Sequence, residues 1–282
     1  MSEKIYLWKN REVSHASIVP FLIEDGEKHP AILVIPGGGY GMVCEDSEGH
    51  HVAKVFNQLG YHAFVLDYRI APMKYPEPQQ DAIRAVKFIR GSADKWNVIA
   101  DKIVSCGFSA GGHLAGSIGV LYDKIEAIDG DEYDQVNGKV DAMILVYGVL
   151  TFNDWSNQQT IKNLAGDDEQ LRNLCSLEKA DLSSAPPAFI WATAADQMVS
   201  YRNSVVFAEA MIQAKRPCEL RLFPYGMHGM LLGLDTLDIA DWVKSADNFL
   251  RNQWQARENE TLLLEKYTNA YQVAAEKRYL GE

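Results

Sequence analysis

The sequence predicts an α/β fold in which helices flank a mostly parallel β-sheet. Short apolar runs alternate along the chain with longer segments in which apolar residues recur at helical spacing. This alternation is typical of βα units, because a parallel strand needs a crossover helix to bring the chain back to the next strand. With 282 residues and 47% hydrophobic content, the chain has enough apolar material for the core of one large domain.

The short apolar runs predict the strands and the longer segments predict the helices. We expect strands over 31–35, 62–67, 102–106, 142–147, 188–192 and 219–223. Between them, Ile83, Val86 and Ile89 illustrate the near-helical spacing of apolar residues. We expect helices over 49–59, 81–96, 110–122, 203–215 and 238–251.

Two segments fall outside this alternation. Residues 151–185 show no strand pattern, and we expect a small cap there, because α/β enzymes often carry one in such an insertion. Residues 255–282 are polar, with Leu262 and Tyr271 on roughly one helical face, and they predict an added C-terminal helix that docks on its own domain or joins subunits of a homo-oligomer. We therefore expect a catalytic domain over residues 1–254 followed by a helical tail.

The composition excludes several classes of partner. The chain carries 27 Lys and Arg against 38 Asp and Glu, and its formal charge of −11 repels nucleic acids and anionic membrane surfaces. We expect no signal peptide and no membrane span, because charges interrupt the N-terminal apolar residues and no apolar stretch reaches ~18 residues. Four scattered cysteines without a CxxC spacing favour reduced thiols in a cytoplasmic protein.

A G-x-S-x-G pattern, Gly107 to Gly111, lies between a predicted strand and a predicted helix. In this setting the serine occupies a tight, strained turn, and only very small residues fit two positions before and after it. The helix N-terminus favours negative charge beside the Ser109 hydroxyl, and the Ala110 amide points toward the reacting carbonyl oxygen. The pattern therefore predicts Ser109 as a nucleophile.

A glycine-rich loop, Pro36 to Gly41, follows the strand predicted over 31–35. Glycine allows the backbone to turn its N–H groups toward an anion, so Gly38 and Gly39 are candidate oxyanion donors together with Ala110. The loop lacks the full G-x-G-x-x-G pattern of a dinucleotide site. A plain flexible turn is the other interpretation of this loop.

A serine nucleophile needs a histidine base and a carboxylate that orients it. His228 follows the last predicted strand and Asp196 follows the strand over 188–192, so both lie at the carboxyl edge of the sheet, in the order Ser, Asp, His. The rival histidines fit less well: His113 faces along the helix toward the sheet, where a packing role is expected, and His50 and His51 precede Ser109. Among the rival carboxylates, Asp181 follows no strand and Asp141 precedes one.

These motifs resemble the hormone-sensitive-lipase-like and acetyl-xylan-esterase-like branches of the α/β-hydrolases. The resemblance covers roughly residues 30 to 250, and the segments 75–82 and 108–114 are closest to small bacterial carbohydrate acetylesterases. It implies an α/β-hydrolase fold, short-acyl ester substrates, a triad of Ser109, Asp196 and His228, and a structural role for Arg69. The sequence departs from the family where Pro36 replaces the histidine of His-Gly-Gly-Gly and Gly148 replaces a frequent proline.

We therefore expect a serine carboxylesterase that cleaves acetyl or other short-chain esters, including those of sugars or xylo-oligosaccharides, and that needs no metal or cofactor. A small peptidase, amidase or arylformamidase using the same residues is the alternative, and a catalytically silent binding protein on the same fold is a third. Candidate substrate contacts are Tyr40, Tyr201 and Met230, although aromatic residues there could equally fill the core.

Overall fold

The computed structural model describes residues 3–10 and 14–258. The chain forms two compact units, residues 1–241 and 242–282. The first unit is built on one eight-stranded sheet with the strand order β1-β2-β4-β3-β5-β6-β7-β8. The strands are β1 (Ile5–Tyr6), β2 (Ser17–Phe21), β3 (His29–Ile35), β4 (His62–Asp67), β5 (Val98–Phe108), β6 (Ala142–Val146), β7 (Ala188–Thr193) and β8 (Cys218–Phe223).

Strands β3 to β8 pair in parallel, whereas β1 and β2 form an antiparallel edge beside β4. The predicted mostly parallel sheet with flanking helices is confirmed. The two N-terminal strands were not expected. Strand β1 has only two residues and β2 includes Pro20, so neither produces the longer uninterrupted apolar run by which the other strands were predicted.

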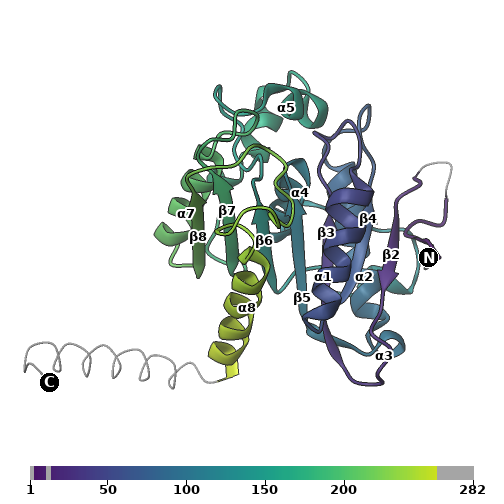
Figure 1. Ribbon diagram of the computed structural model, residues 1–282. Coiled ribbons are helices and arrows are strands. Elements are labelled where there is room, and N and C mark those ends of the chain that lie inside the picture. Colours follow the sequence, from purple (N-terminus) through teal and green to yellow (C-terminus); the bar gives the residue numbers. More distant parts are fainter. Residues whose placement is uncertain (1–2, 11–13, 259–282) are drawn as a thin grey trace, which may run out of the picture. The chain divides into compact units, whose positions relative to one another are not determined.

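Helices connect the parallel strands and cover both faces of the sheet, with α1 in front and α2 behind it in Figure 1. The longer ones in this part of the chain are α1 (His51–Gln58), α2 (Glu77–Gly91), α4 (Ala110–Val120) and α7 (Arg202–Gln213). The shorter turns are η1 (Glu45–His50), α3 (Ala93–Trp96), η2 (Tyr122–Lys124) and η3 (Glu132–Gln135). The predicted helix over 49–59 is therefore two elements, a π-helical turn η1 followed by α1.

The core lies on both faces of the central strands. Every residue of β6 and of β7 is buried, and Ala31 to Ile35 of β3 are fully inaccessible to solvent. This double burial explains why these strands are continuous apolar runs and do not alternate apolar with polar residues. Each fully buried Val, Leu or Ile side chain contributes about 1.5–3 kcal/mol.

The segment 151–185 holds two short helices, α5 (Gln158–Ala165) and α6 (Glu169–Cys175), and the turn η4 (Leu177–Lys179). The Asn157 side chain accepts a hydrogen bond from the Thr160 amide, and the Asp168 side chain caps α6 in the same way. Figure 1 shows α5 at one end of the strands. This insertion contains no strand, as the sequence predicts.

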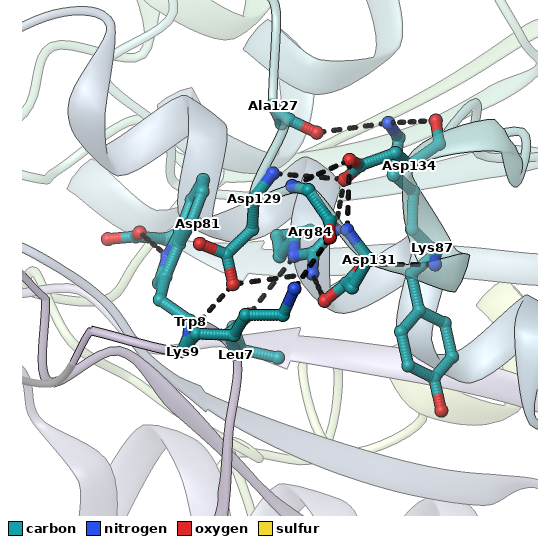
Figure 2. A network of polar contacts seen from close by, with 12 residues as sticks. Leu7, Trp8, Lys9, Asp81, Arg84, Lys87, Ala127, Asp129, Asp131 and Asp134 are labelled. Carbon is teal, nitrogen blue, oxygen red and sulfur yellow. Dashed lines mark hydrogen bonds and ion pairs between the residues drawn. The ribbon is translucent and has the colours of Figure 1, made fainter.

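Two arginines of the first unit, Arg84 and Arg69, lie in buried ionic contacts. Figure 2 shows the contacts of Arg84. Arg84 is fully buried and binds the Leu7 carbonyl and the carboxylates of Asp131 and Asp134. Arg69 pairs with the buried Asp81, with 2.8 Å between its Nη2 and the carboxylate Oδ1. The predicted structural role of Arg69 agrees with this geometry.

The second unit contains helix α8 (Trp242–Glu258). It begins four residues after the start of the helix predicted over 238–251. Nearly all of the predicted tail, residues 255–282, lies outside the described residues, so its packing and its role in oligomerisation stay predictions. Among the helices that the structure describes, none combines the length and apolar character that crossing a membrane requires.

Candidate active site

Ser109 occupies the turn between β5 and α4. Its backbone has φ 53° and ψ −117°, a strained conformation for a residue with a side chain. The glycines on either side are required by close backbone contacts: a Cβ at Gly107 would lie 2.0 Å from the Gly111 oxygen, and one at Gly111 would lie 2.1 Å from the Ile35 oxygen. The strand and helix can approach this closely only because both positions lack a side chain.

Three side chains from distant parts of the sequence form a hydrogen-bonded row at the carboxyl edge of the sheet. His228 Nε2 lies 2.9 Å from Ser109 Oγ, and His228 Nδ1 lies 2.7 Å from Asp196 Oδ2. The carboxylate can only accept at neutral pH, so Nδ1 carries the proton and Nε2 is free to accept from the serine. The predicted residues Ser109, Asp196 and His228 are thus brought together in one chemical unit.

Asp196 is buried and held as a carboxylate. Its Oδ1 accepts hydrogen bonds from the amides of Met198 and Val199, while Oδ2 contacts His228. Burial alone would raise the pKa of Asp196, but the hydrogen bonds from His228 and the two amides outweigh it and hold the pKa below its usual value. Asp196 is therefore ionised at neutral pH, and its charge can stabilise the imidazole of His228 when that ring is protonated.

The glycine loop faces Ser109 with two unused amides. The carbonyls of Gly37, Gly38 and Gly39 all accept hydrogen bonds, and the Gly37 amide donates to Glu48. Within the residues that the structure describes, the amides of Gly38, Gly39 and Ala110 donate to no protein acceptor. These three N–H groups are available to an external oxygen, as an oxyanion hole requires.

A buried carboxylate that was not predicted from the sequence lies beside this loop. Glu48 in η1 is 6% exposed; its Oε2 accepts from the Gly37 amide at 2.6 Å and its Oε1 from the Tyr147 hydroxyl at 3.0 Å. Burial raises the pKa of Glu48, and these two hydrogen bonds oppose that rise. No strand end or known motif marks Glu48, and only its place on an irregular helical turn brings it to the site.

The Tyr147 side chain connects Glu48 to His228. Its ring packs edge-on against the imidazole of His228, with centroids 5.0 Å apart, and against Trp191 on its other side. Tyr147 follows β6 and has φ 36°, an uncommon conformation for a tyrosine. The imidazole of His228 thus contacts Asp196 at one nitrogen and the Tyr147 ring at its side.

The rival residues lie elsewhere. His113 is fully buried, with Nε2 2.8 Å from the Cys175 carbonyl oxygen, in agreement with the packing role expected for it. His50 contacts Glu45 and Asp46, and His51 is exposed on α1. Asp141 pairs with Arg90, and Asp181 bonds the Ser183 amide at the surface. None of these side chains contacts Ser109.

An open cavity of about 530 Å³ lies beside Ser109, a size suited to a small molecule. Its walls come from the glycine loop, η1, α5, the turn after β7 and the His228 loop. The lining residues are Gly38, Gly39, Gly41, Met42, Cys44, Glu48, Ser109, Asn157, Gln159, Thr160, Asn163, Met198, Val199 and His228. In the described part of the chain, no cluster of His, Cys, Asp and Glu is arranged to hold a metal ion.

The candidate substrate contacts Tyr40, Tyr201 and Met230 are not among these lining residues. Tyr40 is fully buried, with its hydroxyl 2.8 Å from His113 Nδ1, so the expectation of a substrate contact was wrong there. The positive φ of Tyr40, 56°, turns its side chain into the core while the preceding glycines face the cavity. The sequence marks Tyr40 as part of the loop but does not indicate this direction.

Known proteins with similar sequences include esterases and xylan-degrading enzymes. The chain is 37% identical over 243 residues to endo-1,4-beta-xylanase B of Butyrivibrio fibrisolvens, covering 81% of this chain and 38% of that protein. It is 30% identical over 244 residues to the acetylxylan esterase of Xylanibacter ruminicola, covering 82% of this chain and 48% of that protein. The chain thus spans less than half the length of these curated relatives.

Solved structures support the same grouping. The crystal structure of the acetyl ester-xyloside bifunctional hydrolase from Caldicellulosiruptor lactoaceticus superposes with a TM-score of 0.84 at 33% identity, covering 89% of this chain and 96% of that one. With the strand order and the strained serine turn, this similarity identifies the first unit as an α/β-hydrolase fold. The family model BD-FAE matches residues 22–211, and the chain therefore belongs to the BD-FAE family.

Proposed function

We propose that this protein is a serine carboxylesterase that hydrolyses acetyl and other short-chain esters through an acyl-enzyme. The observation that carries the proposal is the row Ser109–His228–Asp196, which lies beside three amides without a protein acceptor. A serine is a weak nucleophile until a positioned base removes its proton, and this geometry supplies that base.

In acylation, His228 Nε2 takes the proton of the Ser109 hydroxyl as its oxygen attacks the ester carbonyl. The negative oxygen of the tetrahedral intermediate accepts hydrogen bonds from the amides of Gly38, Gly39 and Ala110. The imidazolium, stabilised by Asp196, returns the proton to the leaving alcohol. Water then attacks the acyl-enzyme by the same steps, with His228 again as base, and releases the acid.

Sugar esters are the substrate class that we propose, on the support of the relatives and of the cavity. The acetylxylan esterase and the acetyl ester-xyloside hydrolase are similar over most of this chain. On the α5 side, the cavity carries the polar side chains of Asn157, Gln159, Thr160 and Asn163, whose groups can donate to and accept from hydroxyls.

We also propose a cytoplasmic location for this protein. Its four cysteines are free thiols, which supports a reducing compartment.

The test is turnover of p-nitrophenyl acetate by the native protein and by Ser109→Ala. We expect a burst of nitrophenol followed by steady turnover in the native protein, and a loss of at least about 10³-fold in kcat in the variant. A panel that varies acyl length and includes peracetylated xylose then tests the substrate class. Normal turnover in Ser109→Ala would exclude the mechanism, and an optimum at long acyl chains would exclude the sugar-ester assignment.

A further inference from the structure

Glu48 is a charged side chain of the site that the mechanism above does not use. It is almost fully buried, it lines the cavity beside Ser109, and it projects from η1, an irregular turn at the start of the first helical segment. A buried carboxylate is costly unless its oxygens are hydrogen-bonded, so its contacts indicate what it does. Both of its oxygens have a partner in the active site.

The shorter contact is with the first amide of the glycine loop. The Gly37 N–H donates to Glu48 Oε2 at 2.6 Å, a short, charge-assisted hydrogen bond. The next two residues along the chain are Gly38 and Gly39, whose amides are free. Because a peptide plane is rigid, fixing the N–H of Gly37 fixes the peptide group from which the glycine loop starts.

The carbonyl groups of this loop are also held. The Gly37 carbonyl accepts from the Cys44 amide at 3.0 Å, and the Gly39 carbonyl accepts from Asn163 Nδ2 at 2.8 Å. Glycine residues have wide conformational freedom, so a loop of three needs such restraints to present two amides in one direction. Glu48 is the only ionisable side chain among the restraints described for Gly37, Gly38 and Gly39.

We propose that Glu48 is a positioning residue that holds the glycine loop in its oxyanion-binding form by accepting the Gly37 amide. This inference rests on the proposed esterase function and adds a residue to it. The role depends on the reach of the side chain and on an acceptor atom at its end, and a negative charge is not required. Two substitutions separate these properties.

Glu48→Gln keeps the length of the side chain and an acceptor oxygen but removes the charge. Glu48→Asp keeps the charge but shortens the side chain by one methylene, which takes the acceptor away from Gly37. We expect kcat for p-nitrophenyl acetate to fall about 10- to 100-fold in Glu48→Asp, less than the ~10²–10³ caused by removing a donor outright. We expect Glu48→Gln to stay within about threefold of the native kcat, and KM to change little in both.

The matched control is Glu45→Asp, the same chemical change on the same turn. Glu45 is partly exposed and pairs with Lys4 at 3.5 Å, outside the cavity lining. Its kcat should equal that of the native protein. Thermal unfolding of every variant shows whether a lower rate reflects loss of folded protein.

Native kcat in a folded Glu48→Asp protein would overturn the inference. So would a Glu48→Gln protein that is as slow as Glu48→Asp, because the charge and not the position of the acceptor would then matter. The rate at which a fluorophosphonate labels Ser109 gives a second readout, since its phosphoryl oxygen also gains negative charge in the oxyanion hole. This rate should order the variants in the same way.

The labelling measurement separates failure of this inference from failure of the proposed function. Native protein that labels at Ser109 but hydrolyses no ester would contradict the esterase assignment, and the labelling rates of the Glu48 variants would still decide the role of Glu48. Ester turnover that is lost in Ser109→Ala but unchanged in Glu48→Asp would contradict only the positioning role.

Discussion

At the scale of single residues, His113 shows how burial sets the charge of a histidine that lies close to the nucleophile in sequence. It follows Ser109 by four residues, yet its ring lies in the core, where it stacks on Phe152 and accepts from the Tyr40 hydroxyl. Burial lowers the pKa of His113 from 6.5 to about 4, opposed by the hydrogen bond to the Cys175 carbonyl. It is therefore neutral in the folded protein at pH 7, and it connects α4 to Tyr40 of the glycine loop and to the end of α6.

This lowered pKa predicts a specific loss of stability in acid. Between pH 6.5 and 4 the unfolded chain binds a proton at His113 that the folded protein does not, so the free energy of unfolding falls as the pH falls. The contribution amounts to about 3 kcal/mol at pH 4 and below. Gln at this position has no group that titrates in this range, and its amide N–H can still donate to the Cys175 carbonyl.

We expect the free energies of unfolding of the native protein and of His113→Gln, measured by urea denaturation at a series of pH values, to differ in their pH dependence. The stability difference between the two should shift in favour of the variant by about 3 kcal/mol from pH 7 to pH 4. His51→Gln, at an exposed site on α1, serves as the control and should show no such shift. Parallel curves for native protein and His113→Gln would contradict the buried neutral histidine.

At the scale of elements, a hydrogen bond joins the insertion over 151–185 to the glycine loop. Asn163 of α5 donates from Nδ2 to the Gly39 carbonyl at 2.8 Å, and its Oδ1 accepts from Gln159. Helix α5 is therefore attached to the loop that carries the free amides. Because a net hydrogen bond contributes about 0.5–1.5 kcal/mol, its loss should matter to the loop more than to the whole fold.

Asn163→Ala should lower kcat for short esters about 2- to 10-fold while the unfolding temperature changes little. The exposed neighbour Lys162, changed to Ala, is the control within the same helix. Steady-state kinetics and thermal unfolding of the two variants make the comparison. An unchanged kcat in Asn163→Ala would mean that the glycine loop keeps its form without the hydrogen bond from Asn163.

At the scale of the whole molecule, the parts that sequence predicts best are those with a local signal. The central parallel strands were expected because burial on both faces makes them nearly continuous apolar runs, as in β6 and β7. The edge strand β8 is only partly buried and includes Glu219 and Arg221. The positions of Ser109, Asp196 and His228 follow from the same logic, since each comes directly after a strand at one edge of the sheet. Glu48 and the inward turn of Tyr40 were not predicted, because each depends on contacts between segments distant in sequence or on an unusual backbone angle.

The antiparallel edge of the sheet was also not predicted, and its attachment depends on long-range contacts. Arg84 on α2 donates to the Leu7 carbonyl, its guanidinium lies over the Trp8 ring, and Lys9 donates to Asp129 and Gly130 (Figure 2). The same guanidinium pairs with Asp131 and Asp134. One buried arginine therefore connects the N-terminal segment to the loop before β6.

Replacing this arginine should destabilise the fold without changing the chemistry at Ser109. In Arg84→Met the Leu7 carbonyl and the two carboxylates lose their donor, so we expect the free energy of unfolding to fall by about 3 kcal/mol. Proteolysis should then cut the N-terminal segment sooner, while kcat of the folded protein stays at the native value. Lys54→Met, on the exposed side of α1, is the control for adding a methionine. Native stability in Arg84→Met would show that the N-terminal strands are held by their sheet pairing with β4 alone.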